Sequence, residues 1–365
     1  MAKLTIPSEE LLTGGHVACQ GCGAALAMRL LLKGLGSDTV LVIPACCWAV
    51  IPGPMPGSCL NVSTVFSAFE ATAAMASGVK AGLRRTGRGN TTVVAFAGDG
   101  GTADIGIQAL SGAAERDEDI LYVCYDNEAY MNTGIQRSGL TPPAAWTTTT
   151  PKGLEKRTGK KDMPEIMAAH GISYVATANP SFPEDLVAKA KKAREMKGTR
   201  YLHILADCPT GWKHDPAKMV DVGRLATTSL IWPLYEIENG VFRITWAPAS
   251  PHPVEKYLRS QGRFRQMSPA DIEEIQRRVD ARWKTLKARE SPAAAGHVEK
   301  AVPPTGPVHR PMKPLPQLPP ETPRALTADA YPRCYKEAAK VCDGSCGKLM
   351  LGGVCSELWL GEVGA

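Results

Sequence analysis

The chain has 365 residues, of which 44% are hydrophobic and 21% charged, so it can form a globular protein with a large apolar core. Its net charge of +6 is not gathered into a Lys/Arg-rich run with interleaved aromatic residues, which argues against a nucleic acid partner. No apolar run approaches the roughly 20 residues that cross a bilayer, which argues against a membrane protein.

The N-terminus and the cysteine count bear on the cellular compartment. The opening segment MAKLTIPSEELLTGG lacks the apolar stretch of a signal peptide, so we expect a cytoplasmic protein. Disulfides are rare in that compartment, and the eleven cysteines therefore predict metal binding or redox chemistry.

Predicted helices and strands alternate along residues 1–230. In chain order they are a helix at 23–35, a strand at 40–43, a helix at 67–85, a strand at 91–97, a helix at 102–115, a strand at 120–125, a helix at 183–197 and a strand at 201–205. The strands are short and apolar throughout, as in a parallel sheet that is buried on both faces. The sequence therefore predicts an α/β fold, with a parallel sheet covered by helices on both faces.

The composition changes along the rest of the chain. Residues 231–290 are expected to complete the catalytic domain, with a strand at GVFRITW and an amphipathic helix at 269–287 that Ser268 caps. Residues 291–324 are rich in proline and predict a semi-rigid linker. Residues 325–365 form a small tail that contains cysteines.

A glycine-rich loop and an asparagine follow two of the predicted strands. Gly98-Asp99-Gly100 comes directly after strand 91–97, and Asn127 comes shortly after strand 120–125. The carboxyl ends of parallel strands meet at one edge of a sheet, so Asp99 and Asn127 can face each other across a crevice. Their oxygens suit Mg²⁺, and glycines before a helix let N–H groups approach a diphosphate. GDG alone often marks a turn, but Asn127 at this spacing favours a magnesium–diphosphate site.

This pattern resembles the thiamine diphosphate signature, in which GDG is followed further along the chain by Asn. Residues 125–136, YDNEAYMNTGIQ, resemble the corresponding segment of pyruvate:ferredoxin oxidoreductase β subunits. The likeness covers about residues 10–290. The family's usual double Asn is Asp126-Asn127 here.

The resemblance implies roles for individual residues. Asp99 and Asn127 would coordinate Mg²⁺ through their side chains and Ala129 through its carbonyl, while Asn132 would lie near the thiazolium and the substrate as the catalytic residue. The expected cofactor-binding residues are Gly98, Asp99, Gly100, Gly101, Asn127, Ala129, Asn132 and Thr133.

Several cysteines lie just before the first helix or just after predicted strands. Cys19 and Cys22 form C-x-x-C, the pair Cys46-Cys47 follows strand 40–43, and Cys208 follows strand 201–205. Thiolates from such loops can converge on a [4Fe–4S] cluster or on a structural Zn²⁺, or they can remain inert buried thiols. The spacing by itself leaves these alternatives open.

The family resemblance favours the iron–sulfur cluster. Cys19 and Cys22 match the β-subunit motif C-x-G-C-G, and the segment CPTGW that begins at Cys208 matches without change. By register, the remaining ligand is Cys47 and not its neighbour Cys46. The resemblance thus implies one [4Fe–4S] cluster held by Cys19, Cys22, Cys47 and Cys208.

The tail carries four cysteines outside the family match. They are spaced C-x₇-C-x₃-C-x₈-C, at Cys334, Cys342, Cys346 and Cys355. They can hold an additional Zn²⁺ or a second iron–sulfur cluster. The alternative is a tail that docks on other subunits.

Together these features predict the β subunit of a 2-oxoacid:ferredoxin oxidoreductase. The reaction would convert a 2-oxoacid, by default pyruvate, and coenzyme A to acyl-CoA and CO₂, with electrons passed through the cluster to ferredoxin. The family implies α, γ and ferredoxin-like δ partner subunits, one of which would supply the Glu that acts on the aminopyrimidine ring. This chain offers no convincing Glu for that role, and Glu70, in the predicted small-residue helix, is the one residue of this type expected near the site.

Three alternatives remain at this stage. The same chemistry can act on an aromatic 2-oxoacid such as phenylglyoxylate or on a branched-chain acid. A non-redox thiamine diphosphate decarboxylase explains Asp99 and Asn127 but leaves the cysteines without a role. An iron–sulfur or zinc scaffold would make GDG a simple turn.

Overall fold

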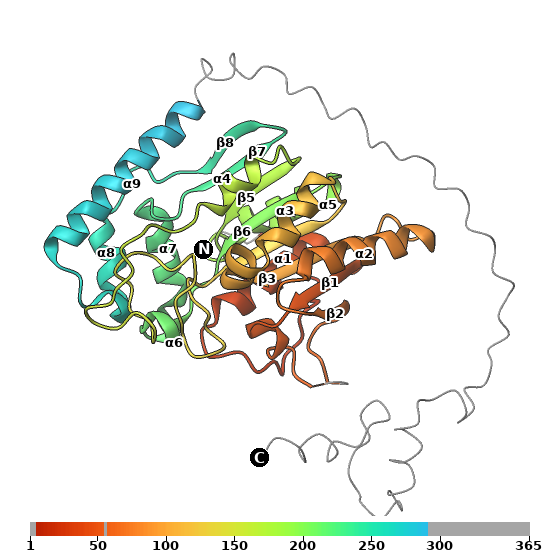
Figure 1. Ribbon diagram of the computed structural model, residues 1–365, viewed down its shortest axis with the longest axis horizontal. Coiled ribbons are helices and arrows are strands. Elements are labelled where there is room, and N and C mark those ends of the chain that lie inside the picture. The colour runs from red at the N-terminus through yellow and green to blue at the C-terminus, as the bar shows by residue number, and fades with distance from the viewer. Residues whose placement is uncertain (1–4, 55–56, 291–365) are drawn as a thin grey trace, which may run out of the picture. The chain divides into compact units, whose positions relative to one another are not determined.

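The computed structural model describes residues 5–54 and 57–290 (Figure 1). An eight-stranded sheet with strand order β2-β1-β3-β4-β6-β5-β7-β8 forms its centre. The strands are β1 (Thr39–Pro44), β2 (Ser63–Ser67), β3 (Thr92–Gly98), β4 (Leu121–Asp126), β5 (Tyr174–Ala178), β6 (Arg200–Leu205), β7 (Leu234–Glu238) and β8 (Val241–Trp246). Strands β1 to β6 pair in parallel, and the hairpin of β7 and β8 joins β5 by antiparallel pairing. The predicted parallel sheet is confirmed, with this antiparallel edge added to it.

Helices cover both faces of the sheet, as predicted. They are α1 (Gly23–Leu35), α2 (Thr72–Arg85), α3 (Ile107–Glu115), α4 (Met163–Ala168), α5 (Pro183–Glu195), α6 (Pro209–Trp212), α7 (Met219–Thr228), α8 (Val254–Arg259) and α9 (Pro269–Arg289). One apolar core joins α1 and α5 to one face of the sheet. A second core joins α2, α3, α4 and the C-terminal part of α9 to the other face. A third lies among α6, α7, α8 and the N-terminal part of α9.

The central strands are buried on both faces, which explains their continuous apolar sequences. Every residue of β1, β3, β4 and β6 is buried. Along β3, Val94 and Phe96 enter the core beneath α1 and α5, while Val93 and Ala95 enter the opposite core. The ring of Phe96 stacks on Tyr125 of β4 with centroids 5.1 Å apart. This packing fixes the ends of β3 and β4 next to each other.

The structure differs from the predicted elements in two places that matter for function. The helix predicted at 67–85 begins only at Thr72: Ser67 ends the edge strand β2, which pairs with β1, and a turn at residues 69–70 precedes the helix. The helix predicted at 102–115 is interrupted: Gly101–Ile105 form a π-helical turn, and regular α-helix starts at Ile107. Such turns are frequent at functional sites.

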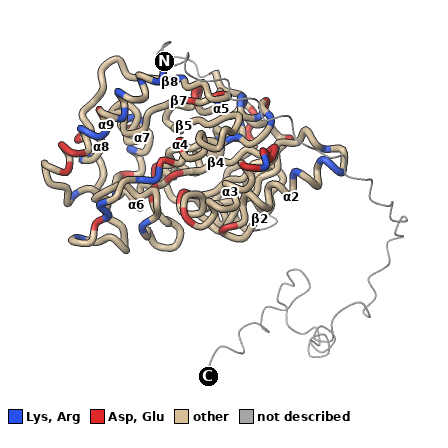
Figure 2. The backbone as a smooth tube through the Cα atoms, turned by 45° about the horizontal axis from the view of Figure 1, so that its top comes forward, with Lys and Arg blue, Asp and Glu red and all other residues tan. Residues whose placement is uncertain are grey.

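The helix predicted at 269–287 is confirmed as α9, together with its N-terminal cap. The Ser268 hydroxyl and the Asp271 carboxylate form a reciprocal capping box, and Pro269 occupies the first turn. Acidic and basic residues are interspersed along α9 and over the rest of the described chain (Figure 2). Within the described residues, no helix has the length and apolar character that crossing a membrane requires. The predicted linker at 291–324 and the four tail cysteines lie outside the described residues.

Candidate active site

The predicted magnesium ligands lie at the carboxyl ends of β3 and β4. Gly98, the last residue of β3, pairs with Tyr125 of β4, so the segments that leave the two strands start side by side. Asp99 and Asn127 follow these strands, and both are buried. Asp99 and Asn127 therefore leave neighbouring strand ends, as the parallel sheet predicted.

Three polar groups meet at this point. The side-chain amide of Asn127 lies 3.0 Å from Asp99 Oδ1 and 2.8 Å from the carbonyl oxygen of Ala129, and without a metal its nitrogen can donate to both. Turned over, the amide would present its oxygen to a cation bound between these groups. In an octahedral Mg²⁺ site with metal–oxygen distances of about 2.05 Å, adjacent ligand oxygens are about 2.9 Å apart. These residues therefore fit a magnesium ion.

The electrostatics of Asp99 also fit a bound cation. Burial and the nearby Asp126 carboxylate raise the pKa of Asp99 well above its usual range, against the hydrogen bond from Ser138. A carboxylate in this position is therefore costly to ionise without a positive charge beside it. A divalent cation would supply that charge.

Asp126, the departure from the family's double Asn, has its own counter-charges. Its carboxylate accepts hydrogen bonds from Lys160 Nζ at 2.8 Å and from His203 Nε2 at 3.0 Å. Although burial acts in the opposite direction, these two partners lower the pKa of Asp126 to about 2. The extra negative charge beside Asn127 is therefore compensated within the protein.

Glu128 stands between two predicted ligands in a strained backbone conformation. Its φ of 68° is in the left-handed region that residues with a side chain rarely adopt. Its carboxylate bonds Lys160 Nζ at 2.6 Å and Arg263 at 2.5 Å. These buried ion pairs hold the residue in place, so that Asn127 and the carbonyl of Ala129 can face the same point.

The glycines of the loop are required by close packing. A Cβ atom at Gly100 would lie 2.1 Å from the ring of Tyr130, and one at Gly101 would lie 3.0 Å from the ring of Phe69. The helical segment that begins here presents free N–H groups at its first turn, and these groups favour an anion. The predicted diphosphate-binding role of the loop fits this local structure.

Asn132 and Thr133 lie apart from the buried ligands, in an exposed turn. The Thr133 hydroxyl donates to Gln136 Oε1 at 2.6 Å, and among the described residues no hydrogen bond joins either residue to Asp99 or Asn127. Glu70 is also exposed, in the turn before α2, next to Phe69. The roles predicted for Asn132 and Thr133 remain predictions.

Cys22 and Cys208 lie at two contacting helix starts. Cys22 is the N-cap of α1 and Cys208 the N-cap of α6, and the N–H of Gly23 donates to the Asp207 carbonyl at 2.8 Å. Cys47 begins a short 3₁₀ turn after β1. Burial, together with the nearby Cys46, Cys208 and Cys22, raises the pKa of Cys47 to about 12.

Cys19 belongs to the same neighbourhood, although its side chain is exposed. Burial raises the pKa of Cys208 to about 12, and Cys22 and Cys19 contribute in the same direction. Across residues 5–54 and 57–290, no three His, Cys, Asp or Glu side chains are closed around a common metal position. The four predicted thiols are thus close enough to influence one another, and ligation by a cluster would draw them together.

Cys46 has a different environment from Cys47. Burial raises its pKa, while hydrogen bonds with the Tyr125 side chain and with backbone groups, including that of Gly98, oppose this. Its thiol is engaged with the end of β3 and β4, whereas that of Cys47 is near Cys22 and Cys208. This arrangement agrees with the register that selects Cys47.

The segment that begins at Cys208 contacts the segment that carries the predicted magnesium ligand Asn127. The indole N–H of Trp212, within CPTGW, donates to the carbonyl of Asn127 at 2.9 Å. A Cβ at Gly211 would lie 2.3 Å from Met131 Sδ, so any larger residue there would have to displace the Met131 side chain. The CPTGW motif therefore positions one predicted cluster ligand against the segment that carries the predicted metal ligands.

Replacing Gly23 with alanine is expected to disturb this junction. Its Cβ would lie 2.6 Å from the backbone nitrogen of Asp207, which cannot move without shifting the end of β6. We expect unfolding to become easier by about 1–3 kcal/mol, with loss of iron from the purified protein. Gly78→Ala in α2 is the control, because nothing lies within 4 Å of its Cβ. Thermal melting and iron analysis would check this, and an unchanged Gly23→Ala variant would contradict the packing described.

Several residues at the site were not predicted from the sequence. Ser138 Oγ donates a very short hydrogen bond to Asp99 Oδ2, and Lys160 joins Asp126 to Glu128. Neither residue belongs to a recognisable motif. Lys160 lies in a loop that follows the signature segment, and its local sequence does not indicate that it pairs with Asp126 and Glu128.

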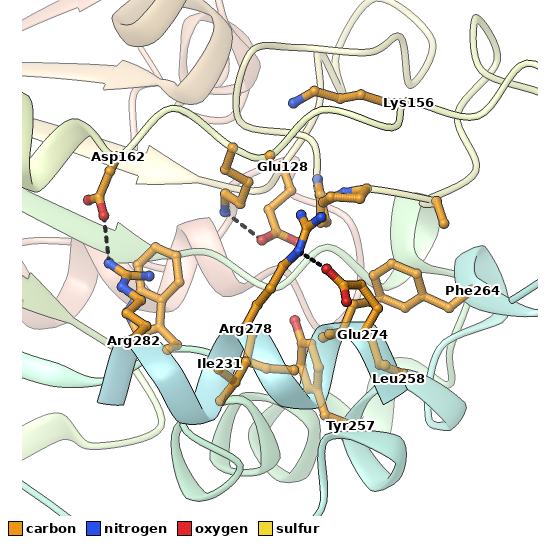
Figure 3. A pocket seen from close by; sticks show the side chains of 18 of the residues that line it. Glu128, Lys156, Asp162, Ile231, Tyr257, Leu258, Phe264, Glu274, Arg278 and Arg282 are labelled. Atoms are coloured by element: carbon orange, nitrogen blue, oxygen red, sulfur yellow. Dashed lines mark hydrogen bonds and ion pairs between the residues drawn. The ribbon is translucent and has the colours of Figure 1, made fainter. Parts of the chain in front are cut away.

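A cavity of about 630 Å³ adjoins Glu128 (Figure 3). Apolar side chains that include Ile231, Leu258 and Phe264 line it, together with the loop at 155–164 and α9. The ion pair of Asp162 and Arg282, 3.0 Å long, joins that loop to α9. Neither Asp99 nor Asn127 lines this cavity, so it is separate from the predicted magnesium site.

Comparison with known proteins places this arrangement in a class. Residues 46–204, which include both ligand segments and Cys47, match the family described as thiamine pyrophosphate enzyme, C-terminal TPP binding domain. Thiamine pyrophosphate is thiamine diphosphate, so the class is that of thiamine diphosphate-dependent enzymes.

Curated relatives identify the family more narrowly. Pyruvate synthase subunit PorB of Methanothermobacter marburgensis is 52% identical over 287 residues, which cover 78% of this chain and 100% of the relative. Ketoisovalerate oxidoreductase subunit VorB of Pyrococcus abyssi is 49% identical over 296 residues, which cover 78% of this chain and 95% of the relative. The chain belongs to the β subunits of the 2-oxoacid:ferredoxin oxidoreductases, and the resemblance seen in the sequence is confirmed.

Proposed function

We propose that the chain provides the Mg²⁺–thiamine diphosphate site and a [4Fe–4S] cluster for oxidative decarboxylation of a 2-oxoacid. The products would be acyl-CoA and CO₂, with electrons leaving through the cluster to ferredoxin. The observation that carries the proposal is the close approach of Asp99 Oδ1, the Asn127 side-chain amide and the Ala129 carbonyl, beside segments that bring Cys22, Cys47 and Cys208 near one another. Bound thiamine diphosphate supplies the electron sink that decarboxylation needs.

The residues of this chain would act by holding and orienting the cofactor. Asp99 provides the single anionic oxygen of the magnesium site, and Asn127 and Ala129 provide neutral ones. The loop at 98–101 presents backbone N–H groups to the diphosphate at the start of a helix. Burial of Asp99 and Asn127 excludes water from this side of the metal, which strengthens each interaction.

The cluster part of the proposal rests on the mutual proximity of the thiols. Cys22 and Cys208 occupy joined helix starts, and Cys47 is near both. The bond from Trp212 to Asn127 ties this region to the cofactor segment, which is the arrangement that short-range electron transfer requires. A structural Zn²⁺ fits the same ligand types, so the metal must be established by analysis.

Two substrates are favoured by the comparisons. One relative is named a pyruvate synthase subunit and another a ketoisovalerate oxidoreductase subunit, at 52% and 49% identity. We therefore propose pyruvate as the substrate, with a branched-chain 2-oxoacid as the second candidate. Asn132 and Thr133 are proposed to face the substrate from their exposed turn.

Exposed apolar side chains beside the site favour assembly with partner subunits. Val50, Phe66 and Ile105 are 53%, 50% and 49% exposed, and Val50 and Ile105 follow Cys47 and Gly101 closely in the chain. Apolar groups grouped around a site are typical of an interface. We propose that a partner subunit covers this face and supplies the Glu that acts on the aminopyrimidine ring.

The test uses the enzyme complex purified with its neighbouring subunits under anaerobic conditions. We expect bound thiamine diphosphate and magnesium, iron with inorganic sulfide, and CoA-dependent reduction of ferredoxin by pyruvate or 2-oxoisovalerate. Cofactor and decarboxylation without iron would indicate a non-redox enzyme instead. Metal without thiamine diphosphate would indicate a scaffold. Comparing pyruvate, 2-oxoisovalerate and phenylglyoxylate would identify the substrate.

A further inference from the structure

A turn at residues 138–141 joins the two segments that carry the predicted magnesium ligands. The Ser138 hydroxyl donates a very short hydrogen bond to Asp99 Oδ2. The Thr141 hydroxyl donates to the carbonyl of Glu128 at 2.7 Å. Glu128 lies between Asn127 and Ala129, so this turn, which we call the clasp turn, contacts both segments that leave β3 and β4.

The two oxygens of Asp99 have separate tasks in this arrangement. Oδ1 lies 3.0 Å from the Asn127 amide, which also reaches the Ala129 carbonyl, whereas Oδ2 is held by Ser138. A carboxylate with one oxygen fixed in this way can offer only the other to a metal. Ser138 therefore sets the rotation of the carboxylate and leaves Oδ1 directed toward Asn127 and Ala129.

We propose that Ser138 and Thr141 are positioning residues for the metal: Ser138 orients Asp99, and Thr141 fixes the distance between the two ligand segments. The inference rests on the proposed function, because it assumes that Asp99 and Asn127 bind Mg²⁺. Residues that orient metal ligands without touching the metal commonly change metal affinity by about 10- to 100-fold.

The clasp turn is itself internally braced. The N–H of Ser138 donates to Thr141 Oγ1 at 2.9 Å, and the N–H of Leu140 donates to Ser138 Oγ at 3.1 Å. Ser138 and Thr141 are completely buried. Each hydroxyl accepts one hydrogen bond inside the turn and donates another to a ligand segment, which fixes the direction of the O–H group. Because both hydroxyls are buried, water cannot replace the donated bonds.

Lys156 holds the clasp turn through hydrogen bonds to its backbone. Its ammonium donates to the carbonyls of Gly139 at 3.0 Å and Thr141 at 2.7 Å, and the side chain is buried next to the cavity shown in Figure 3. Burial, together with Arg137 and Lys160, lowers the pKa of Lys156 to about 8. Burying the charge of a lysine is unfavourable by itself. The hydrogen bonds to the backbone carbonyls offset this cost, and they hold the turn in one conformation.

Gly139 is needed for the same turn to approach the first ligand segment. Its N–H donates to Asp104 Oδ2 at 2.8 Å, and a Cβ atom would lie within 2.3 Å of Asp104 Oδ1. Asp104 belongs to the π-helical turn that begins at Gly101. The clasp turn is therefore anchored to the glycine-rich loop by its backbone as well as by Ser138.

The experiment measures how much Mg²⁺ the purified complex needs to bind thiamine diphosphate. Bound metal is removed with a chelator, and Mg²⁺ is titrated back while cofactor binding is followed by quenching of tryptophan fluorescence. We expect Ser138→Ala to raise the half-saturating Mg²⁺ concentration by about 10- to 100-fold. Thr141→Val should raise it as well, whereas Thr141→Ser, which keeps the hydroxyl, should restore it.

Matched variants separate positioning from a general loss of stability. Ser229→Ala removes an equally buried hydroxyl that bonds only Ala226 within its own helix end. The melting temperature of the metal-free complex should change no more in Ser138→Ala than in Ser229→Ala. If Ser138→Ala and Thr141→Val titrate like the unmodified complex, or if Ser229→Ala shifts the titration as much, the clasp turn has no positioning role.

Asp99→Ala in the same titration distinguishes this inference from the proposed function. Loss of all Mg²⁺-dependent binding in Asp99→Ala, with a normal Ser138→Ala, overturns only the role of the clasp turn. A normal titration in Asp99→Ala overturns the metal site and with it the proposed function. Weakened binding in Ser138→Ala together with none in Asp99→Ala supports both.

Discussion

Replacing Asp99 with alanine is expected to empty the thiamine diphosphate site while the fold remains intact. Asp99 supplies the only anionic oxygen among the predicted ligands, since Asn127 and Ala129 offer neutral ones. Its loss would leave only two neutral oxygens to bind a doubly charged ion. We expect the metal affinity to fall by more than the roughly 10- to 100-fold that is typical when a residue that only orients a ligand is lost. The diphosphate depends on that metal, so cofactor and metal should be lost together.

The effect of Asp99→Ala on stability should be small or favourable in the metal-free protein. Burial and Asp126 raise the pKa of Asp99, which means that the ionised carboxylate is unfavourable there without a cation. Removing it relieves that repulsion, as often happens when a functional residue is lost. The Ser138 hydroxyl still accepts from the N–H of Leu140.

Asp126→Asn is the matched control for Asp99→Ala. It also removes a buried negative charge beside the site, but it removes no predicted ligand and creates the double Asn usual in the family. Lys160 keeps Glu128 as its partner. Thiamine diphosphate and magnesium contents of the two purified complexes decide the matter: cofactor retained by Asp99→Ala, or lost equally in Asp126→Asn, contradicts the assignment.

The sequence predicted the central elements because their signals are local. Helix 23–35 was predicted with the bounds that α1 has, and α9 was predicted from Ser268 and the proline that follows it. The strands β2, β5 and β7 were not predicted. β2 is mostly exposed, and β5 is a run of only five residues, Tyr174–Ala178, whose place in the sheet depends on pairing with β6 and β7.

The same distinction applies to the site. Asp99 and Asn127 could be paired from sequence because each follows a buried strand, and strand ends in a parallel sheet share an edge. Ser138 could not be predicted, because its contact with Asp99 spans 39 positions and depends on how a loop folds back. The left-handed conformation of Glu128 is likewise set by Lys160 and Arg263, which lie far along the chain.

Serine variants of Cys19, Cys22, Cys47 and Cys208 are expected to lose the iron–sulfur cluster, whereas Cys46→Ser should keep it. A [4Fe–4S] cluster in such a protein takes four thiolates, so loss of one leaves an iron without its ligand. Cys47 is near Cys22 and Cys208, while the Cys46 thiol interacts with Tyr125 and with the backbone of Gly98. The paired cysteines should therefore behave differently although they are adjacent in sequence.

Iron and sulfide content, together with the visible absorbance of the anaerobic complex, measure this difference directly. Electron transfer to ferredoxin should fall with the iron, and thiamine diphosphate should remain, because Asp99 and Asn127 are unchanged. Cys46→Ser is the matched control, since it makes the same substitution one residue away. Loss of iron in Cys46→Ser with iron retained in Cys47→Ser would show that the other member of the pair is the ligand. Zinc in place of iron in the unmodified complex would contradict the cluster itself, because the same thiols then serve a structural metal and electrons must leave by another route.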